Sequence, residues 1–173
     1  MNTIEFSITI VINFLLKIIG LNPATDIGEG WSFEKEINGA EGNDGITAFK
    51  EAIQKAALLP KEEGRKLLFA TGLAEGATSI TGEDKIKALS KRALADPDLG
   101  WSLYKEEGQK TLRYLHDTYG VTWMEFLRRV LRSPGGSRVS LYLYRGDVGS
   151  WVWSYYWLDD DRNASIPALA LGE

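Results

Sequence analysis

An aromatic segment near the carboxyl end constrains the fold more than any other part of the chain. Residues 139–144 and 150–158 alternate large side chains, and residues 145–149 between them include two glycines. Because side chains alternate faces along a strand, the pattern predicts a β-hairpin. The aromatic face of this hairpin is either the sheet half of the core or a recognition surface for a partner. The rings that would bind the partner are Tyr142, Tyr144, Trp151, Trp153, Tyr155 and Trp157.

The composition indicates one domain over residues 1–173. Of these residues 44% are hydrophobic, enough for a single core of ordinary size. The chain has no cysteine, which excludes disulfides, thiolate zinc sites and cysteine nucleophiles. Its formal charge of -4 gives no general attraction to nucleic acid. The composition does not fix the compartment and slightly favours the cytoplasm.

The longest apolar concentration lies at the amino end, in residues 4–21. Isoleucine and phenylalanine occupy the even positions from Ile4 to Ile12, against the polar residues Glu5, Ser7 and Thr9. This alternation predicts a strand with one buried face, followed by a short helix. Two alternatives remain open for the segment: a membrane helix that would anchor an accessory protein, and a secretory signal. We expect residues 1–20 to add a strand to the sheet.

The middle of the chain indicates a glycine-rich loop followed by helices. Residues 21–44 have loop composition, in which residues 30–37 are a candidate strand. Residues 45–132 carry successive helix signals and predict about five helices. Their expected boundaries include Asp44, Pro60, the capping pair Thr81 and Asp84, the Asp96-Pro97 pair, Gly120, and the capping box of Thr122 with Glu125.

These elements predict an α+β fold. About five helices in residues 45–132 would pack on a small antiparallel sheet. The sheet would consist of the hairpin and a last strand, within residues 138–171, joined by the amino-terminal strand.

An acidic stretch follows the hairpin and resembles the start of an EF-hand-type calcium loop. Asp159, Asp161 and Asn163 match its first three ligand positions, an alternation that gathers oxygens around Ca²⁺. Ala164 stands where the loop usually has glycine, and Ala170 where it has its bidentate glutamate. The resemblance implies a calcium site, and the alternative is a solvated acidic turn.

Glu75 is the candidate catalytic residue. It ends the apolar stretch of residues 67–75, where burial would favour a protonated carboxyl able to act as a general acid. A glycan-active hydrolase would pair this acid with a second carboxylate and use the tryptophans as a sugar platform.

The chain has no phosphate-binding glycine loop, metal-ligand cluster or nucleophile motif. We therefore predict a non-enzymatic binding or assembly protein that contacts a protein partner, or a second copy of itself, through the hairpin. A glycan hydrolase or glycan-binding module is the alternative, and a membrane-anchored accessory protein is the third. Enzymatic activity stays an open question at this level.

Overall fold

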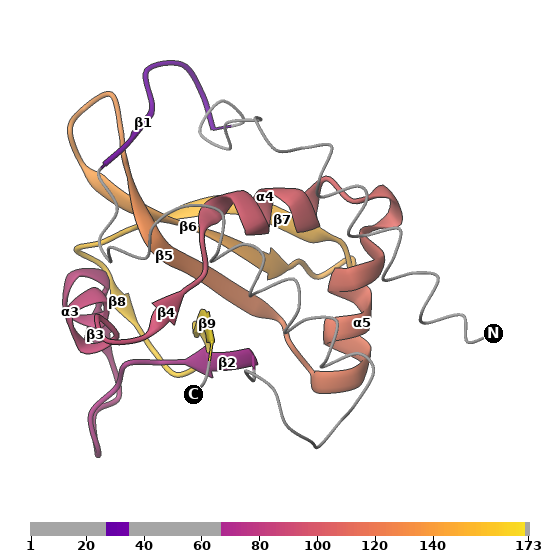
Figure 1. Cartoon of the computed structure of the whole chain (residues 1–173), viewed down its shortest axis with the longest axis horizontal. Coiled ribbons are helices and arrows are strands. Elements are labelled where there is room, and N and C mark those ends of the chain that lie inside the picture. Colours follow the sequence, from indigo (N-terminus) through magenta and orange to yellow (C-terminus); the bar gives the residue numbers. More distant parts are fainter. Residues whose placement is uncertain (1–26, 35–66, 172–173) are drawn as a thin grey trace.

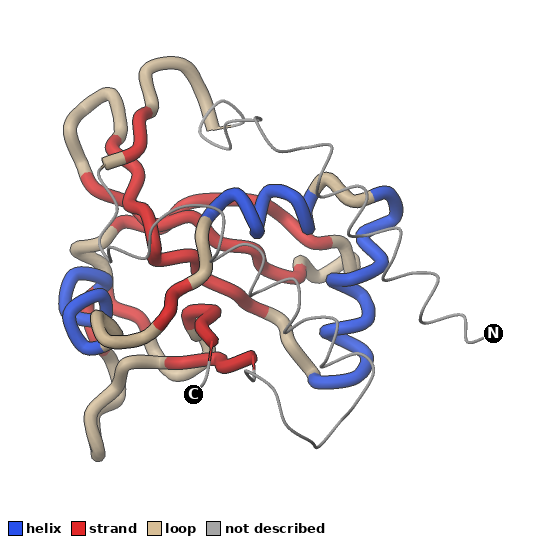
Figure 2. Tube along the Cα trace, viewed as in Figure 1, coloured by secondary structure: helices blue, strands red, loops and turns tan. Residues whose placement is uncertain are grey.

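The computed structural model describes residues 27–34 and 67–171, and these form a sheet with helices on both of its faces (Figure 1). Figure 2 shows how much of this part is strand. In chain order the elements are β1 (Ser32–Phe33), β2 (Leu67–Ala70), β3 (Ile80–Thr81), α3 (Gly82–Ala88), β4 (Ala93–Leu94), α4 (Pro97–Tyr104), the 3-10 turn η2 (Glu107–Gln109), α5 (Lys110–Tyr119), β5 (Trp123–Arg132), β6 (Arg138–Arg145), β7 (Trp151–Trp157), β8 (Asp161–Arg162) and β9 (Ala168–Leu171).

The three longest described strands, β5, β6 and β7, pair antiparallel side by side, and we call them the central strands; β7 is the outermost of the three. The strand order is β2-β9-β5-β6-β7, with β1 paired to β5, β4 paired to β9, and one parallel bridge between β5 and β9. The short strands β3 and β8 make a separate two-stranded sheet. The described residues therefore hold a mixed seven-stranded sheet rather than a small antiparallel one.

Two clusters of buried side chains cover opposite faces of the central strands. On the helix face, α4 packs on side chains that include Phe126, Leu141 and Trp153. On the opposite face, Ile86 of α3 and Leu89, which follows the helix, belong to a smaller cluster around Leu127, Val130 and Leu158. Figure 1 shows α4 lying across the sheet, and α3 beside β3 and β8. We call the second face the network face, after the polar contacts described below.

Ion pairs fasten the peripheral elements to the central strands. Asp96 caps α4 by accepting from the Asp98 N–H at 2.9 Å, and its carboxylate also accepts two hydrogen bonds from Arg129 of β5. Arg138 of β6 pairs with Glu34, which follows β1, and with Glu83 of α3. Both helices are thus tied by charge to the sheet on which they pack.

The prediction of about five helices on a small sheet was wrong, and residues 122–132 show why. Instead of a helix opened by Thr122 and Glu125, they include the ten-residue strand β5. The capping box was a local signal only. Trp123, Phe126 and Val130 suit a pleated surface, and pairing with β6 and β9 decides between the two periodicities.

Three further segments correct the helix prediction. Residues 67–70, expected inside a helix, form β2, since four apolar residues in succession also suit a strand. The helix after Thr81 ends at Ala88, so that residues 93–94 form β4. The single helix expected after Asp96 is interrupted before α5, where Gly108 and Gln109 have φ angles of 67° and 47°.

Other local predictions are confirmed. The hairpin forms as β6 and β7, and β1 and β9 lie inside the two candidate strand segments. Thr81 caps α3, Asp96 caps α4, and Gly120 ends α5 with a φ of 68°. The strand, membrane or signal segment of residues 4–21 and the first expected helix, residues 45–60, lie outside the described residues.

Candidate functional site

The hairpin aromatics do not share one surface. Leu143 of β6 lies opposite Trp153 and Leu141 opposite Tyr155, so the tryptophan side of β7 is the leucine side of β6. Trp151, Trp153, Tyr155 and Trp157 therefore face α4, whereas Tyr142 and Tyr144 face the other way. The six predicted residues divide between the helix face and the network face.

The rings on the helix face are buried in the core at the start of β7 and more exposed at its end. Trp151 and Trp153 are only 3% and 8% exposed. The Trp153 ring packs against Trp101 of α4, with centroids 5.7 Å apart, and against Phe126. Toward the end of β7 exposure increases, and 39% of Trp157 is accessible. This half of the predicted surface mainly holds α4 to the sheet.

The network face carries a different cluster, which we call the aromatic patch: Trp123, Tyr142, Tyr144 and Tyr156. Trp123 and Tyr142 stack with centroids 4.4 Å apart and planes inclined by 13°. Tyr144 and Tyr156 lie 5.7 and 6.1 Å from the Tyr142 ring. Tyr142 is the most buried member, and burial raises the pKa of its hydroxyl. The other three rings remain partly exposed.

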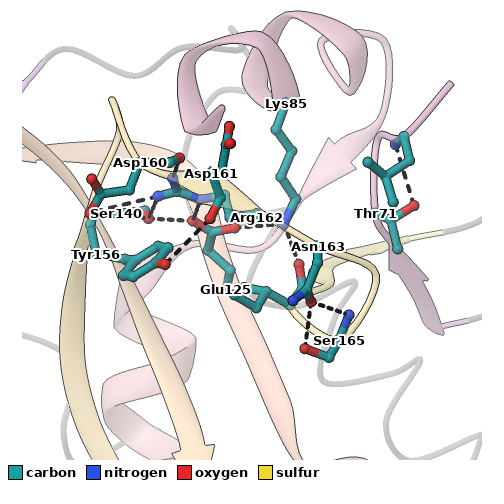
Figure 3. Close-up of polar contacts among 12 residues, drawn as sticks. Thr71, Lys85, Glu125, Ser140, Tyr156, Asp160, Asp161, Arg162, Asn163 and Ser165 are labelled. Atoms are coloured by element: carbon teal, nitrogen blue, oxygen red, sulfur yellow. Dashed lines mark hydrogen bonds and ion pairs between the residues drawn. The ribbon is translucent and has the colours of Figure 1, made fainter. Parts of the chain in front are cut away.

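Beside the patch lies a buried network of Lys85, Glu125, Ser140 and Arg162 (Figure 3). All four residues are 0% exposed. The Glu125 carboxylate accepts from Lys85 Nζ at 2.6 Å and from Arg162 Nε at 2.8 Å. Ser140 donates its hydroxyl hydrogen to the same carboxylate and accepts from Arg162 Nη2 at 3.1 Å. The network thus joins α3, β5, β6 and β8.

Arg162 connects this network to the aromatic patch. Its guanidinium donates to the carbonyls of Trp157 and Asp160 and lies 4.5 Å from the centroid of the Tyr156 ring. Lys85 is satisfied in a similar way, because its Nζ also donates to the Ile166 carbonyl at 2.6 Å. Each buried cation therefore has several oxygen partners.

The electrostatics of the network suit a structural role. Burial lowers the pKa of Lys85, and the adjacent Glu125 carboxylate counteracts part of that effect. With both basic groups charged, the two cations share one carboxylate. All four residues are fully buried, which for charged side chains is usual only when they are paired. They hold Tyr156, and with it one side of the aromatic patch, in a fixed position.

Glu75 lies in an exposed turn after β2 rather than in an apolar pocket. The burial on which its general-acid role was predicted is therefore absent.

The acidic stretch is a turn linked to a short strand. Asp159 and Asp161 are exposed, and Asp161 belongs to β8, where it pairs with Thr81. The Asn163 side-chain oxygen accepts from the backbone N–H of Ser165 at 2.8 Å and from its hydroxyl at 2.6 Å. Across residues 27–34 and 67–171, no three histidine, aspartate or glutamate side chains gather as a metal site would require.

Sequence reasoning missed the network and half of the patch. Trp123 and Glu125 were placed in a helix, and Tyr156 was not among the candidate rings. The available signal was Glu125 itself, a single acidic residue inside the apolar run of residues 123–127. A charge in such a run marks either a solvated helix position or a buried ion pair, and only the pairing of β5 distinguishes them.

Comparison of the chain with protein-family models, with curated proteins and with solved structures found no match. None of the helices in the described part is long and apolar enough to span a membrane.

Proposed function

We propose that this chain is a non-enzymatic binding protein that contacts a protein partner through the aromatic patch. The observation that carries the proposal is the partly exposed cluster of Trp123, Tyr144 and Tyr156 around the Tyr142 ring. Tryptophan and tyrosine are enriched among the residues that dominate the binding energy of protein interfaces. Partly exposed rings gathered on one sheet face have the composition of such a centre.

Rigidity of the patch supports the same function. Tyr142 stacks on Trp123, while Tyr156 lies against the guanidinium of Arg162, whose position is set by the buried network. Rings already held in place lose little conformational entropy when a partner binds, so more of the contact energy appears as affinity.

The stacking geometry favours a protein over a glycan. Sugar platforms offer flat ring faces to the ligand, but Trp123 and Tyr142 turn one face each toward the other at an inclination of 13°. A protein side chain can pack on the remaining edges and hydroxyls, as tyrosine-rich interfaces do.

A photocrosslinking experiment tests this proposal. The photoreactive residue p-benzoylphenylalanine replaces Tyr144, and in a control chain it replaces Val148, which is 91% exposed in the hairpin turn. Irradiation in the native cell should give a discrete adduct at position 144 that is absent at position 148. Mass spectrometry then identifies the crosslinked protein.

The purified partner provides the quantitative measurement. The Tyr144→Ser and Tyr156→Ser variants should each weaken its binding by tenfold or more, since truncating a central aromatic costs about 2 kcal/mol, whereas Val148→Ser should not. Equal adducts at positions 144 and 148, or unchanged affinity in both tyrosine variants, would refute the proposal.

A further inference from the structure

Among residues 27–34 and 67–171, strand β7 is one edge of the sheet, and half of its peptide groups point away from β6. The backbone bonds from Gly146 to the Ser150 carbonyl and from Leu158 to the Arg138 carbonyl place the hydrogen-bonded pairs at even-numbered residues of β7. The N–H and C=O groups of Trp151, Trp153, Tyr155 and Trp157 therefore point outward.

The two ends of this edge are occupied by side chains. At the first end, Gln109 accepts from the Trp151 N–H at 3.2 Å and donates to the Trp151 carbonyl at 3.4 Å. A carboxamide that makes both bonds imitates the peptide group of a neighbouring strand. At the other end, Arg162 Nη1 donates to the Trp157 carbonyl at 2.8 Å.

The middle of the edge is open. Within the described part of the chain, no hydrogen bond is made by the outward backbone groups of Trp153 and Tyr155. Strand β7 also has no charged residue and no proline, the usual devices that keep sheet edges from pairing. The opposite edge differs, because four residues of β2 are described there, against seven in β7.

The unpaired backbone groups of Trp153 and Tyr155 are arranged symmetrically, as a two-fold contact requires. The occupied positions, Trp151 and Trp157, lie at equal distances along the chain from Ser154. We propose that β7 pairs antiparallel with β7 of a second copy of this chain, about an axis at Ser154. Trp153 of each copy then pairs with Tyr155 of the other, and each pair exchanges two backbone hydrogen bonds.

This register uses the outward groups of Trp153 and Tyr155 and stops at Trp151 and Trp157, whose carbonyls already accept hydrogen bonds. It brings the two Ser154 side chains together at a non-hydrogen-bonded position, where opposite strands approach most closely and a small residue fits. It also places both aromatic patches on the same face of one continuous sheet. The pairing itself does not depend on what the patch binds.

The first test measures the oligomeric state of the full chain by sedimentation velocity at increasing micromolar concentrations. The wild-type chain should shift from monomer to dimer. Tyr155→Pro removes an outward N–H without breaking the ladder to β6, so this variant should remain monomeric. The matched variant Tyr155→Val loses the same ring but keeps the N–H, and should still dimerise.

A second test reports the register directly, because the natural chain has no cysteine. Ser154→Cys should form an intermolecular disulfide rapidly under mild oxidation, and combining it with Tyr155→Pro should abolish this disulfide. Val148→Cys, exposed in the hairpin turn, should crosslink slowly. A wild-type chain that stays monomeric, a dimer that survives Tyr155→Pro, or equal crosslinking at 148 and 154 would overturn the proposal. Dimerisation of Tyr144→Ser separates this result from the function of the aromatic patch.

Discussion

Each face of the central strands is covered by a helix that approaches the sheet at a glycine, but the two glycines meet different side chains. On the helix face, α4 presents Gly100, where a Cβ would lie 2.4 Å from the Phe126 ring. On the network face, α3 begins with Gly82, where a Cβ would lie 2.6 Å from the guanidinium carbon of Arg162. A glycine lets each helix approach closely, in one case to apolar rings and in the other to a buried charge.

The two faces also differ in how they bury their side chains. Apolar contacts on the helix face add up along α4, and Leu99, Leu103 and Phe126 are buried completely or almost so. On the network face, part of the buried area is charged. Burying these charges costs free energy, which their mutual interactions offset only when every partner is present. Beyond them the aromatic patch is left partly open.

The largest expected effect comes from breaking the network with Glu125→Gln. The change keeps the shape of the side chain but leaves Lys85 and Arg162 buried without their shared anion, and should reduce the free energy of unfolding by about 3 to 5 kcal/mol. Urea denaturation measures the loss, with Glu75→Gln, an exposed glutamate, as the control. A loss as small as that of the control would show that the network contributes little to the stability of this face.

A smaller effect is expected from Gly100→Ala on the helix face. Alanine favours helices, yet its methyl group would overlap the Phe126 and Trp153 rings, and overpacking of this kind costs about 1 to 3 kcal/mol. Gly135→Ala is the control, since a Cβ there meets its nearest neighbour, the Ser133 hydroxyl oxygen, at 3.8 Å. Thermal unfolding compares the two variants, and equal midpoints would mean that α4 does not rest on the rings.

Removing the cap of α3 should cost about 1 kcal/mol. In Thr81→Ala, the Asp84 N–H loses the hydroxyl that accepts from it at 3.2 Å. Hydrogen exchange should show faster exchange in α3 than in the wild-type chain, with α4 unchanged, and Thr118→Ala on the exposed side of α5 serves as the control. Faster exchange in both helices would indicate that the two faces unfold together.

The smallest expected effect is a change of pH dependence. Burial raises the pKa of Glu106, which follows α4 and accepts from the Thr111 N–H at 2.9 Å. Above pH 4.5 the folded chain retains this proton while the unfolded chain releases it, so stability decreases as pH rises through the folded pKa. The Glu106→Gln variant keeps a hydrogen-bond acceptor and should lack this decrease. Urea titrations between pH 4 and 7 test the difference, and parallel curves would contradict it.

Sequence patterns correctly predicted the features that depend on contacts between residues close in sequence. Thr81, Asp96 and Gly120 mark helix ends through bonds to residues close in sequence, and the hairpin follows from alternation and its turn. The segment from Trp123 to Arg132 has signals for both periodicities, and its long-range pairing with β6 and β9 chose the strand.

The site was harder to predict because its members come from distant parts of the chain. Lys85 lies 40 residues from Glu125, and Arg162 lies 37 residues from Glu125. No short sequence motif therefore predicts the network. The faces of the hairpin depended on its register, which alternation alone does not fix. The observed register pairs Leu143, rather than a neighbouring tyrosine, with Trp153, so Tyr142 and Tyr144 lie on the opposite face of the sheet.

Gln109 has a consequence that reaches beyond its own turn. Because its carboxamide occupies the backbone groups of Trp151, this one side chain would limit how far the proposed pairing extends along β7. A chain without it would offer a longer ladder of vacant donors and acceptors, compatible with shifted registers of the same two-fold pair. The choice of a single register would then rest on a residue outside the hydrophobic core.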